Sequence, residues 1–142
     1  MIKIYTDGSC IGNPGNGGWG AIIVIDEKKT IIKGSKKNTT NNQMELLAPI
    51  KALNEITKGS KVQIFTDSRY VKNGITEWIH NWKKNGWKTA DKQPVKNKQL
   101  WIELDHLSSE YEIIWSWVKA HSIDRLNNEV DLIAKEAANS ET

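Results

Sequence analysis

Two short stretches of the chain end in the same way, with a threonine followed by an aspartate. Asp7 follows residues 5–6 and Asp67 follows residues 65–66, each after an apolar, β-branched run that is typical of a buried strand. Ligands of open α/β sheets gather at the carboxyl ends of strands, so we expect both carboxylates at one edge of a sheet. The simpler interpretation is that Asp7 belongs to a turn and that Asp67 caps a following helix.

Two further acids lie within predicted helices. Glu45 lies about one turn into the first helix, and Asp131 lies among apolar neighbours early in the last one. An acid beside an apolar stripe is unfavourable unless it is paired or binds a cation. Converging carboxylates repel one another, and hard oxygen ligands favour Mg²⁺ or Mn²⁺. Two such ions roughly 3.5–4 Å apart can stabilise the attacking and leaving oxygens of a phosphodiester. The pattern permits this convergence but does not require it.

His121 follows the last predicted strand and precedes Asp131 by ten positions. A lone histidine in a loop is most often a surface residue. Beside metal-bound acids it could instead shuttle protons, because its ordinary pKa lies near neutrality. A role as a metal ligand is disfavoured, since the other candidate ligands are all carboxylates.

The net charge of +3 conceals a strongly basic segment. Residues 82–98 hold six lysines and one acid, Asp91, which gives this segment +5 and leaves −2 for the rest of the chain. Trp78, Trp82 and Trp87 lie in or beside the segment. Lysines interleaved with aromatic residues are typical of nucleic-acid contact, although a solvated lysine face above packed tryptophans gives the same pattern.

Composition limits the class of protein. The chain has 142 residues, of which 38% are hydrophobic. This length and composition fit one globular domain whose core needs no disulfide bond or metal ion for stability. Its single cysteine, Cys10, excludes an internal disulfide framework. No apolar run approaches the roughly 20 residues that span a bilayer, and the first residues lack a signal-peptide pattern. We therefore expect one cytoplasmic domain over 1–142, with a frayed end at 139–142.

Hydrophobic periodicity predicts an α/β fold with a mixed sheet whose first three strands form an antiparallel meander. The glycines and asparagines of 8–18 predict a loop after the first strand, and Pro49 falls inside the first helix. That helix is expected to begin after the capping residues 39–42 and to end at Gly59. The other elements are predicted strands at 2–6, 19–25, 30–35, 62–66 and 111–117, and predicted helices at about 69–84, 97–107 and 129–138.

Several motifs occur together in an order that is typical of one family. They are TDGSC at 6–10, GNPG at 12–15, TNNQME at 40–45, TDS at 66–68, GWKTA at 86–90, VK at 118–119 and the spacing from His121 to Asp131. On these motifs the chain resembles type 1 ribonuclease H, the bacterial ribonuclease HI family, over nearly its whole length. Each motif alone is weak, and their shared order is a strong indication.

The resemblance implies a ribonuclease H-like fold, with a five-stranded mixed sheet of order 3-2-1-4-5 and helices on both faces. It implies cleavage of the RNA strand of RNA–DNA hybrids to 5′-phosphate and 3′-hydroxyl ends, without strong sequence specificity and by a monomer. One Mg²⁺ would activate the attacking water and a second would stabilise the leaving oxygen. By position, the resemblance gives the metal-binding acids as Asp7, Glu45, Asp67 and Asp131, with His121 as the proton shuttle.

The resemblance also implies two sets of substrate contacts. One set reaches the minor groove, where amides can bond the 2′-hydroxyls that distinguish RNA from DNA. The other is a basic protrusion at about 78–98 that holds the DNA strand, with one tryptophan against deoxyribose and the rest lining a phosphate channel. The first set is Cys10, Asn13, Asn41 and Asn42, and the second is Trp78, Trp82, Lys84 and Lys88. Helix capping is the simpler role for the two asparagines at 41–42.

The chain departs from the family pattern around the histidine. Ala120 and Ile123 stand where the family commonly has glycines, and Asn127–Asn128 stands where an Asn-Glu pair is usual. Ala and Ile have less backbone freedom than glycine. Two alternatives stay open: a non-catalytic hybrid-binding module of the same fold, and a DNA nuclease of the junction-resolvase or transposase type. The basic protrusion and the asparagine pair favour the hybrid nuclease.

Overall fold

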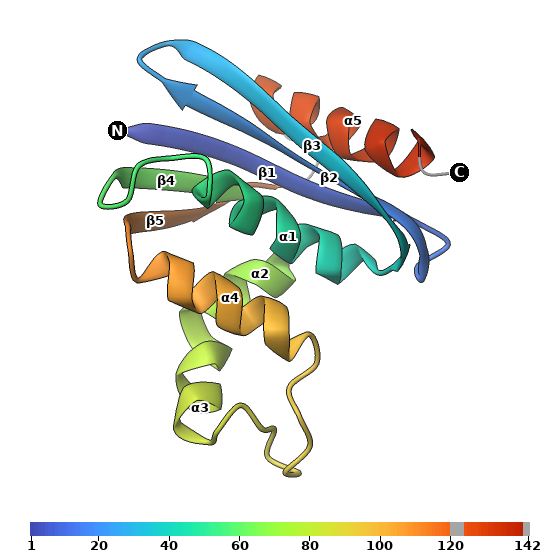
Figure 1. Cartoon of the computed structure of the whole chain (residues 1–142), viewed down its shortest axis with the longest axis vertical. Coiled ribbons are helices and arrows are strands. Elements are labelled where there is room, and N and C mark those ends of the chain that lie inside the picture. The colour runs from blue at the N-terminus through green and yellow to red at the C-terminus, as the bar shows by residue number, and fades with distance from the viewer. Residues whose placement is uncertain (120–123, 141–142) are drawn as a thin grey trace.

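A five-stranded mixed sheet forms the centre of the computed structural model, which describes residues 1–119 and 124–140 (Figure 1). The strand order is β3-β2-β1-β4-β5. The first three strands pair antiparallel, whereas β1, β4 and β5 run parallel. The predicted fold class and strand order are confirmed. The strands are β1 (Ile2–Ile11), β2 (Gly15–Ile25), β3 (Lys28–Thr39), β4 (Lys61–Thr66) and β5 (Glu112–Trp117).

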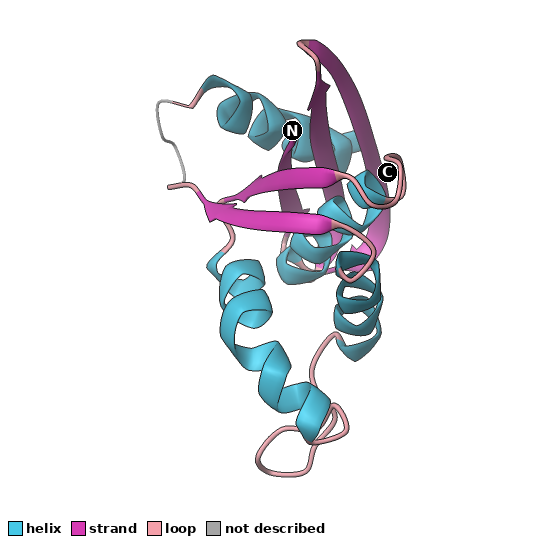
Figure 2. Cartoon of the chain, turned by 90° about the vertical axis from the view of Figure 1, so that its left-hand side faces the viewer, coloured by secondary structure: helices cyan, strands magenta, loops and turns pink. Residues whose placement is uncertain are grey.

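Helices cover both faces of the sheet. In Figure 1, α1 crosses one face of the sheet and α5 lies behind the other. The consecutive helical segments α2, η1 and α3, at residues 69–84, form a nearly continuous rod that leads away from the sheet, and its middle turn, η1, is a π-helix. Figure 2 shows this rod ending in a loop that projects from the body of the molecule. No described helix is long and apolar enough to cross a membrane. The helices are α1 (Asn41–Leu53), α2 (Arg69–Asn73), η1 (Gly74–Trp78), α3 (Ile79–Lys84), α4 (Lys98–Ser108) and α5 (Arg125–Ser140).

Two neighbouring glycines of β2 allow helices to approach the sheet from opposite sides. A Cβ at Gly17 would clash with Thr39 and would lie 2.8 Å from Cγ of Met44 in α1. At Gly18 a Cβ would clash instead with the backbone of α5 at Ala134 and Ala138. Successive strand residues face opposite sides, so both glycines are needed for close approach. The predicted loop at 8–18 is therefore wrong, since β1 extends to Ile11 and β2 begins at Gly15.

The first helix tolerates Pro49 and ends earlier than predicted. Pro49 is buried within α1, which continues for another turn to Leu53. The hydroxyl of Tyr111 donates to the carbonyl of Leu53 at 2.6 Å, satisfying an acceptor that the helix end leaves free. Glu55 and Ile56 follow in turns, so Gly59 is not the end of the helix.

The last helix begins earlier than predicted because a side chain outside the apolar pattern caps it. Asp124 accepts hydrogen bonds from the backbone N–H groups of Leu126 at 3.0 Å and Asn127 at 3.2 Å. These bonds satisfy donors of the first turn, and α5 therefore starts at Arg125 rather than at 129. The helix continues through Ser140 and so includes the first two residues of the expected frayed end. Residues 141–142 lie outside the described residues.

A cluster of aromatic rings joins the projecting rod to the core. Trp101 of α4 is fully buried, and its ring centroid lies 5.3 Å from those of Tyr70 and Trp82. The centroid of Trp82 lies 5.9 Å from that of Trp78 and 6.4 Å from that of Trp87. Aromatic pairs at these separations are attractive beyond the area they bury. The cluster anchors the base of the protrusion against α4.

Candidate active site

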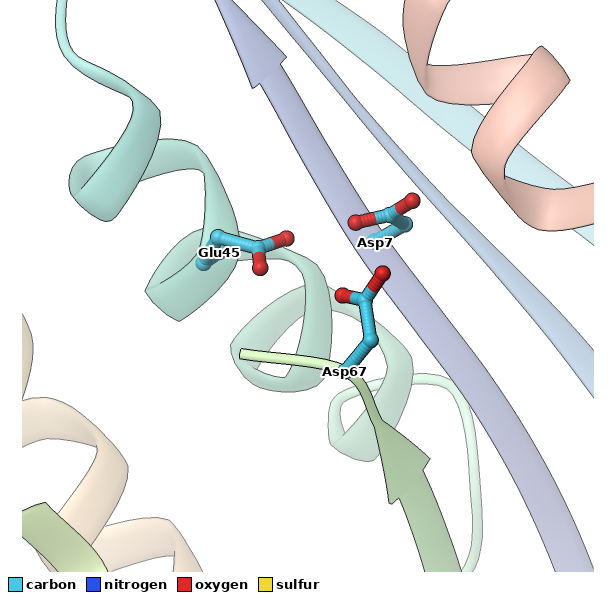
Figure 3. A group of neighbouring side chains, drawn as sticks. All are labelled: Asp7, Glu45 and Asp67. Carbon is cyan, nitrogen blue, oxygen red and sulfur yellow. The ribbon is translucent and has the colours of Figure 1, made fainter. Parts of the chain in front are cut away.

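Three carboxylates from three elements converge beside the carboxyl end of β4. Asp7 comes from β1, Glu45 from α1, and Asp67 directly follows β4 (Figure 3). One ligand oxygen from each lies within 4.8 Å of the others. Asp7 and Asp67 meet because β1 and β4 are parallel neighbours in the sheet. The structure therefore brings Asp7 and Asp67 together as expected, and it places Glu45 beside them.

Gly8 brings α1 close enough for Glu45 to join the two aspartates. A Cβ at Gly8 would lie 2.5 Å from the backbone nitrogen of Glu45, which is too close for any other residue. Its own backbone N–H donates to Oδ1 of Asp7 at 2.9 Å. The glycine after Asp7 thus sets the distance between helix and strand and also orients the first carboxylate.

Burial and mutual repulsion disfavour the charged form of these acids. Only 4% of Asp7 and 6% of Glu45 is exposed. Burial raises the pKa of Asp7 well above its usual range, and the nearby carboxylates of Glu45 and Asp67 raise it further. Burial also raises the pKa of Glu45, although the neighbouring polar groups of Asp7, Gly8 and Ser68 oppose the shift. A bound cation would reverse both effects.

The carboxylate cluster has the donor chemistry of a divalent-cation site. Oε1 of Glu45 is buried and has no hydrogen-bond partner among the described residues. A buried acceptor without a partner is costly, and a cation would satisfy it. All the candidate ligand atoms are carboxylate oxygens, which suit hard divalent ions. The residues present therefore fit a divalent metal ion.

Asp131 lies in the same cleft, at the edge of the three-carboxylate group. It comes from α5, and its side chain is close enough to Asp7 to contribute to the raised pKa of Asp7. Its Oδ2 also pairs with Nζ of Lys135 at 3.0 Å, one helical turn away. The structure thus brings all four predicted acids to one cleft, with Asp131 held by a lysine that sequence reasoning missed. The four-residue spacing of Asp131 and Lys135 is the signal that could have found it.

The cleft around the acids has a volume of about 460 Å³. The predicted residues Asn41 and Asn42 line it. Asn127 is 2% exposed, and its Oδ1 has no partner within the described part of the chain. Its position one turn before Asp131 on α5 could have indicated that it reaches the cleft. The other lining residues that the sequence did not single out are Ser68, Arg69, Tyr70, Asn128 and Lys135.

The two loops beside the cleft are held together by a backbone–side-chain bond. Oδ1 of Asn13 accepts from the backbone N–H of Asn41 at 2.9 Å. Cys10 donates its thiol hydrogen to the carbonyl of Thr39 at 3.3 Å. The cap of α1 is Thr40, which accepts from the N–H of Gln43 at 3.2 Å. Capping therefore does not account for Asn41 or its neighbour at 42, and both side chains are exposed beside the acids.

A second, smaller cleft of about 300 Å³ lies between these loops and the residues that directly precede α4. Asn13, Asn41 and Asn42 line it together with Lys96 and Asn97. Three of the four predicted minor-groove residues therefore share one polar cleft, and two of them, Asn41 and Asn42, also line the cleft that holds the acids.

The predicted protrusion residues differ in exposure. Trp78 is 36% exposed, and Lys84 and Lys88 are exposed around the projecting rod and loop. Trp82 is half-buried in the aromatic cluster, where it packs against its neighbours more than it faces solvent. His121, the predicted proton shuttle, lies outside the described residues.

Known proteins are similar to this chain over nearly its whole length. Residues 1–139 match the model of the RNase H family. Ribonuclease H of Wolbachia sp. subsp. Drosophila simulans (strain wRi) is 54% identical over 136 residues, covering 96% of this chain and 94% of the relative. The crystal structure of LC9-RNase H1, a type 1 RNase H with the type 2 active-site motif, has a TM-score of 0.89 at 29% identity and covers 99% of this chain and 73% of that one. LC11-RNase H1 in complex with RNA/DNA hybrid has a TM-score of 0.69 at 24% identity, covering 99% and 98%, which shows the fold alone.

The matched fold and acidic cleft define a nuclease of the metal-dependent α/β class. The chain belongs to the RNase H family. The family and the enzyme class predicted from the motifs are confirmed, and the family implies use of a divalent metal.

Proposed function

We propose that this chain hydrolyses the RNA strand of RNA–DNA hybrids, leaving 5′-phosphate and 3′-hydroxyl ends, without strong sequence specificity. The observation that carries the proposal is the convergence of Asp7, Glu45 and Asp67, with Asp131 alongside, in a cleft bordered by exposed amides. In a chain of the RNase H family, this arrangement supports hydrolysis of a phosphodiester that lies across the cleft.

The acids are proposed to hold two Mg²⁺ ions, for which Mn²⁺ can substitute. When bound, such ions activate water and stabilise the leaving oxygen. The protein holds the carboxylates in place through Gly8, which bonds Asp7, and through Lys135, which pairs with Asp131. The burial of Asp7 and Glu45 excludes water that would screen their charge.

His121 is proposed to move the proton between water and the leaving group. This role rests on its spacing from Asp131 in the sequence. A histidine is suited to the task because its charge changes near neutral pH.

Two surfaces are proposed to distinguish the strands of the hybrid. Cys10, Asn13 and the asparagines at 41 and 42 face the RNA side, where exposed amides can bond 2′-hydroxyls. The protrusion holds the DNA strand, and its residues are Trp78, Trp82, Lys84 and Lys88. Lysine contacts to phosphates position a duplex without reading its sequence. We also propose that the chain forms one domain and acts as a monomer in the cytoplasm.

The proposal is tested with four labelled substrates: RNA–DNA hybrid, double-stranded DNA, double-stranded RNA and single-stranded RNA. Each is incubated with Mg²⁺ and with EDTA, and the ends of the products are identified. We expect cleavage of the RNA strand in the hybrid alone, and only with the metal. Binding without cleavage would favour a hybrid-binding module, and cleavage of DNA would favour a resolvase- or transposase-type nuclease.

A further inference from the structure

Two cations gather over one indole ring beside the acidic cleft. The guanidinium carbon of Arg69 lies 5.3 Å from the ring centroid of Trp117, and Nζ of Lys72 lies 5.4 Å from it. Together with Asn73 these residues line a cavity of about 230 Å³. Both cations are exposed at their positions on α2. The cavity therefore presents two positive charges, an aromatic face and an amide to solvent.

The two charges have no neutralising partner in the described part of the chain. Other lysines do find one, such as Lys29 with Glu129 and Lys83 with Asp105. No described carboxylate lies within ion-pair distance of Arg69 or Lys72. The pair is three residues apart on one helix, so the charges share a face and repel each other. A cation–π contact attracts each charge to the ring but does not remove this repulsion. A bound anion would remove the repulsion, because it neutralises both charges.

The cavity adjoins the metal-binding acids. Trp117 is the last residue of β5 and pairs with Thr66, which directly precedes Asp67. Its indole N–H donates to the backbone carbonyl of Asp67 at 3.2 Å. Arg69 lines both this cavity and the larger cleft that holds the carboxylates. An anion bound in the cavity would therefore lie next to the phosphodiester that the acids address.

We propose that Arg69, Lys72 and Trp117 form a subsite for a backbone phosphate of the RNA strand, next to the phosphate that is cut. The inference rests on the proposed function, because the cut strand is the one that lies at the acids. A guanidinium matches two phosphate oxygens at once, and the ammonium adds a second charge. The indole orders both side chains before the strand arrives, which lowers the entropy cost of binding. The subsite positions the RNA strand and takes no part in bond breaking.

The first test measures how binding depends on salt. Binding of hybrid is compared between the unaltered chain, Arg69→Gln, Lys72→Gln and the double variant, with Ca²⁺ in place of Mg²⁺ so that the substrate stays intact. The slope of log affinity against log salt concentration should become shallower by about 1 for each cation removed. Lys61→Gln is the matched control, because this exposed lysine begins β4 roughly 17 Å from its carboxyl end and should leave the slope unchanged.

The second test locates the phosphate. The substrate is a hybrid in which the strand to be cut contains one short block of ribonucleotides. In a series of such hybrids, a single backbone phosphate is replaced by an uncharged methylphosphonate, at each position of either strand in turn. One position beside the cleavage point in the RNA strand should weaken binding of the unaltered chain and have no effect on Arg69→Gln/Lys72→Gln. In cleavage assays the double variant should raise KM and leave kcat within about twofold, since the lost contact is present before and after the chemical step.

Three results would overturn the subsite. They are an unchanged salt slope in the double variant, a response to methylphosphonate only in the DNA strand, and a lower Tm with normal hybrid binding. The last would show that the cations merely pack the indole ring. Failure of the proposed function is seen separately, as absence of hybrid cleavage by the unaltered chain with Mg²⁺, whereas the salt slope is measured by binding alone.

Discussion

Burial of Asp7 and Glu45 makes the metal-free protein sensitive to pH. Both carboxyls have a raised pKa in the folded state, so the folded protein holds protons more tightly than the unfolded chain. Folding stability therefore falls as pH rises from about 4, where the unfolded carboxyls titrate, towards the higher folded values. In EDTA we expect Tm to decline between pH 5 and pH 8, measured by calorimetry. Added Mg²⁺ should raise Tm more at pH 8 than at pH 5, and an equal effect at both would contradict a proton–metal competition.

Asp7→Asn separates stability from activity. The amide removes a buried charge from the carboxylate cluster, so in EDTA at pH 8 we expect stabilisation by about 2 kcal/mol, or roughly 5 °C in Tm. The same change should abolish Mg²⁺-dependent cleavage while hybrid binding stays measurable. Asp26→Asn, in the exposed turn between β2 and β3, is the control and should alter neither property. Retained cleavage in Asp7→Asn would show that these acids are not the metal site.

His121→Ala tests the proposed proton shuttle. We expect kcat to fall by roughly 10²-fold, at the lower end of general acid–base effects, with hybrid binding retained. Steady-state kinetics with a labelled hybrid, together with a binding assay, make the measurement. An unchanged kcat would remove the histidine from the mechanism.

The two aspartates were predictable from the sequence because each comes two residues after the last pair that joins β1 to β4, Tyr5 with Phe65. Asp67 directly follows β4, whereas Asp7 lies within β1, which continues to Ile11. The parallel pairing of the two strands brings the carboxylates together. The four-residue spacing of Lys135 from Asp131 predicts their ion pair, but its position beside the other acids was not predictable, because it depends on how α5 is turned about its own axis. The subsite at Trp117 depends similarly on the packing of α2 against β5, which no short stretch of sequence encodes.

The glycines of β2 show a second limit of prediction from sequence, at the level of the secondary-structure elements. Glycine-rich residues 8–18 read as a loop because glycine favours turns in local statistics. In the structure Gly17 and Gly18 lie in a strand, and they are small so that α1 and α5 can approach it. Such a requirement arises between elements that are distant in sequence. The strand order, in contrast, was implied by the family resemblance, and it is confirmed.

Gly18→Ala tests this close approach. Its Cβ would meet backbone atoms of α5, which cannot move aside without displacing the helix, so we expect destabilisation on the order of 3 kcal/mol. Gly20→Ala is the matched comparison. Its Cβ would lie 2.7 Å from Cγ2 of Ile133, a side chain that can shift, so the loss should be smaller. Urea denaturation measures both, and an equal loss would contradict the distinction between backbone and side-chain clashes.

For the whole molecule, the net charge of +3 divides into two opposing regions. The segment 82–98 carries +5 and projects from the body of the protein, whereas the rest carries −2 and includes the buried acids (Figure 1). The acids repel a phosphate until cations bind them, while the protrusion attracts one at any metal concentration. Binding of the duplex and loading of the catalytic site are thus separable in space.

This separation predicts that the protrusion dominates the salt dependence of hybrid binding. We expect affinity to fall steeply with salt, and the slope of log affinity against log salt concentration to become shallower by about 2 in Lys84→Gln/Lys88→Gln. Lys51→Gln, an exposed lysine in the last turn of α1, should leave the slope unchanged. Because the altered lysines lie away from the acids, kcat at saturating hybrid should also be retained. A flat salt dependence, or equal slopes in the double variant and the control, would show that the protrusion is not the main contact with the duplex.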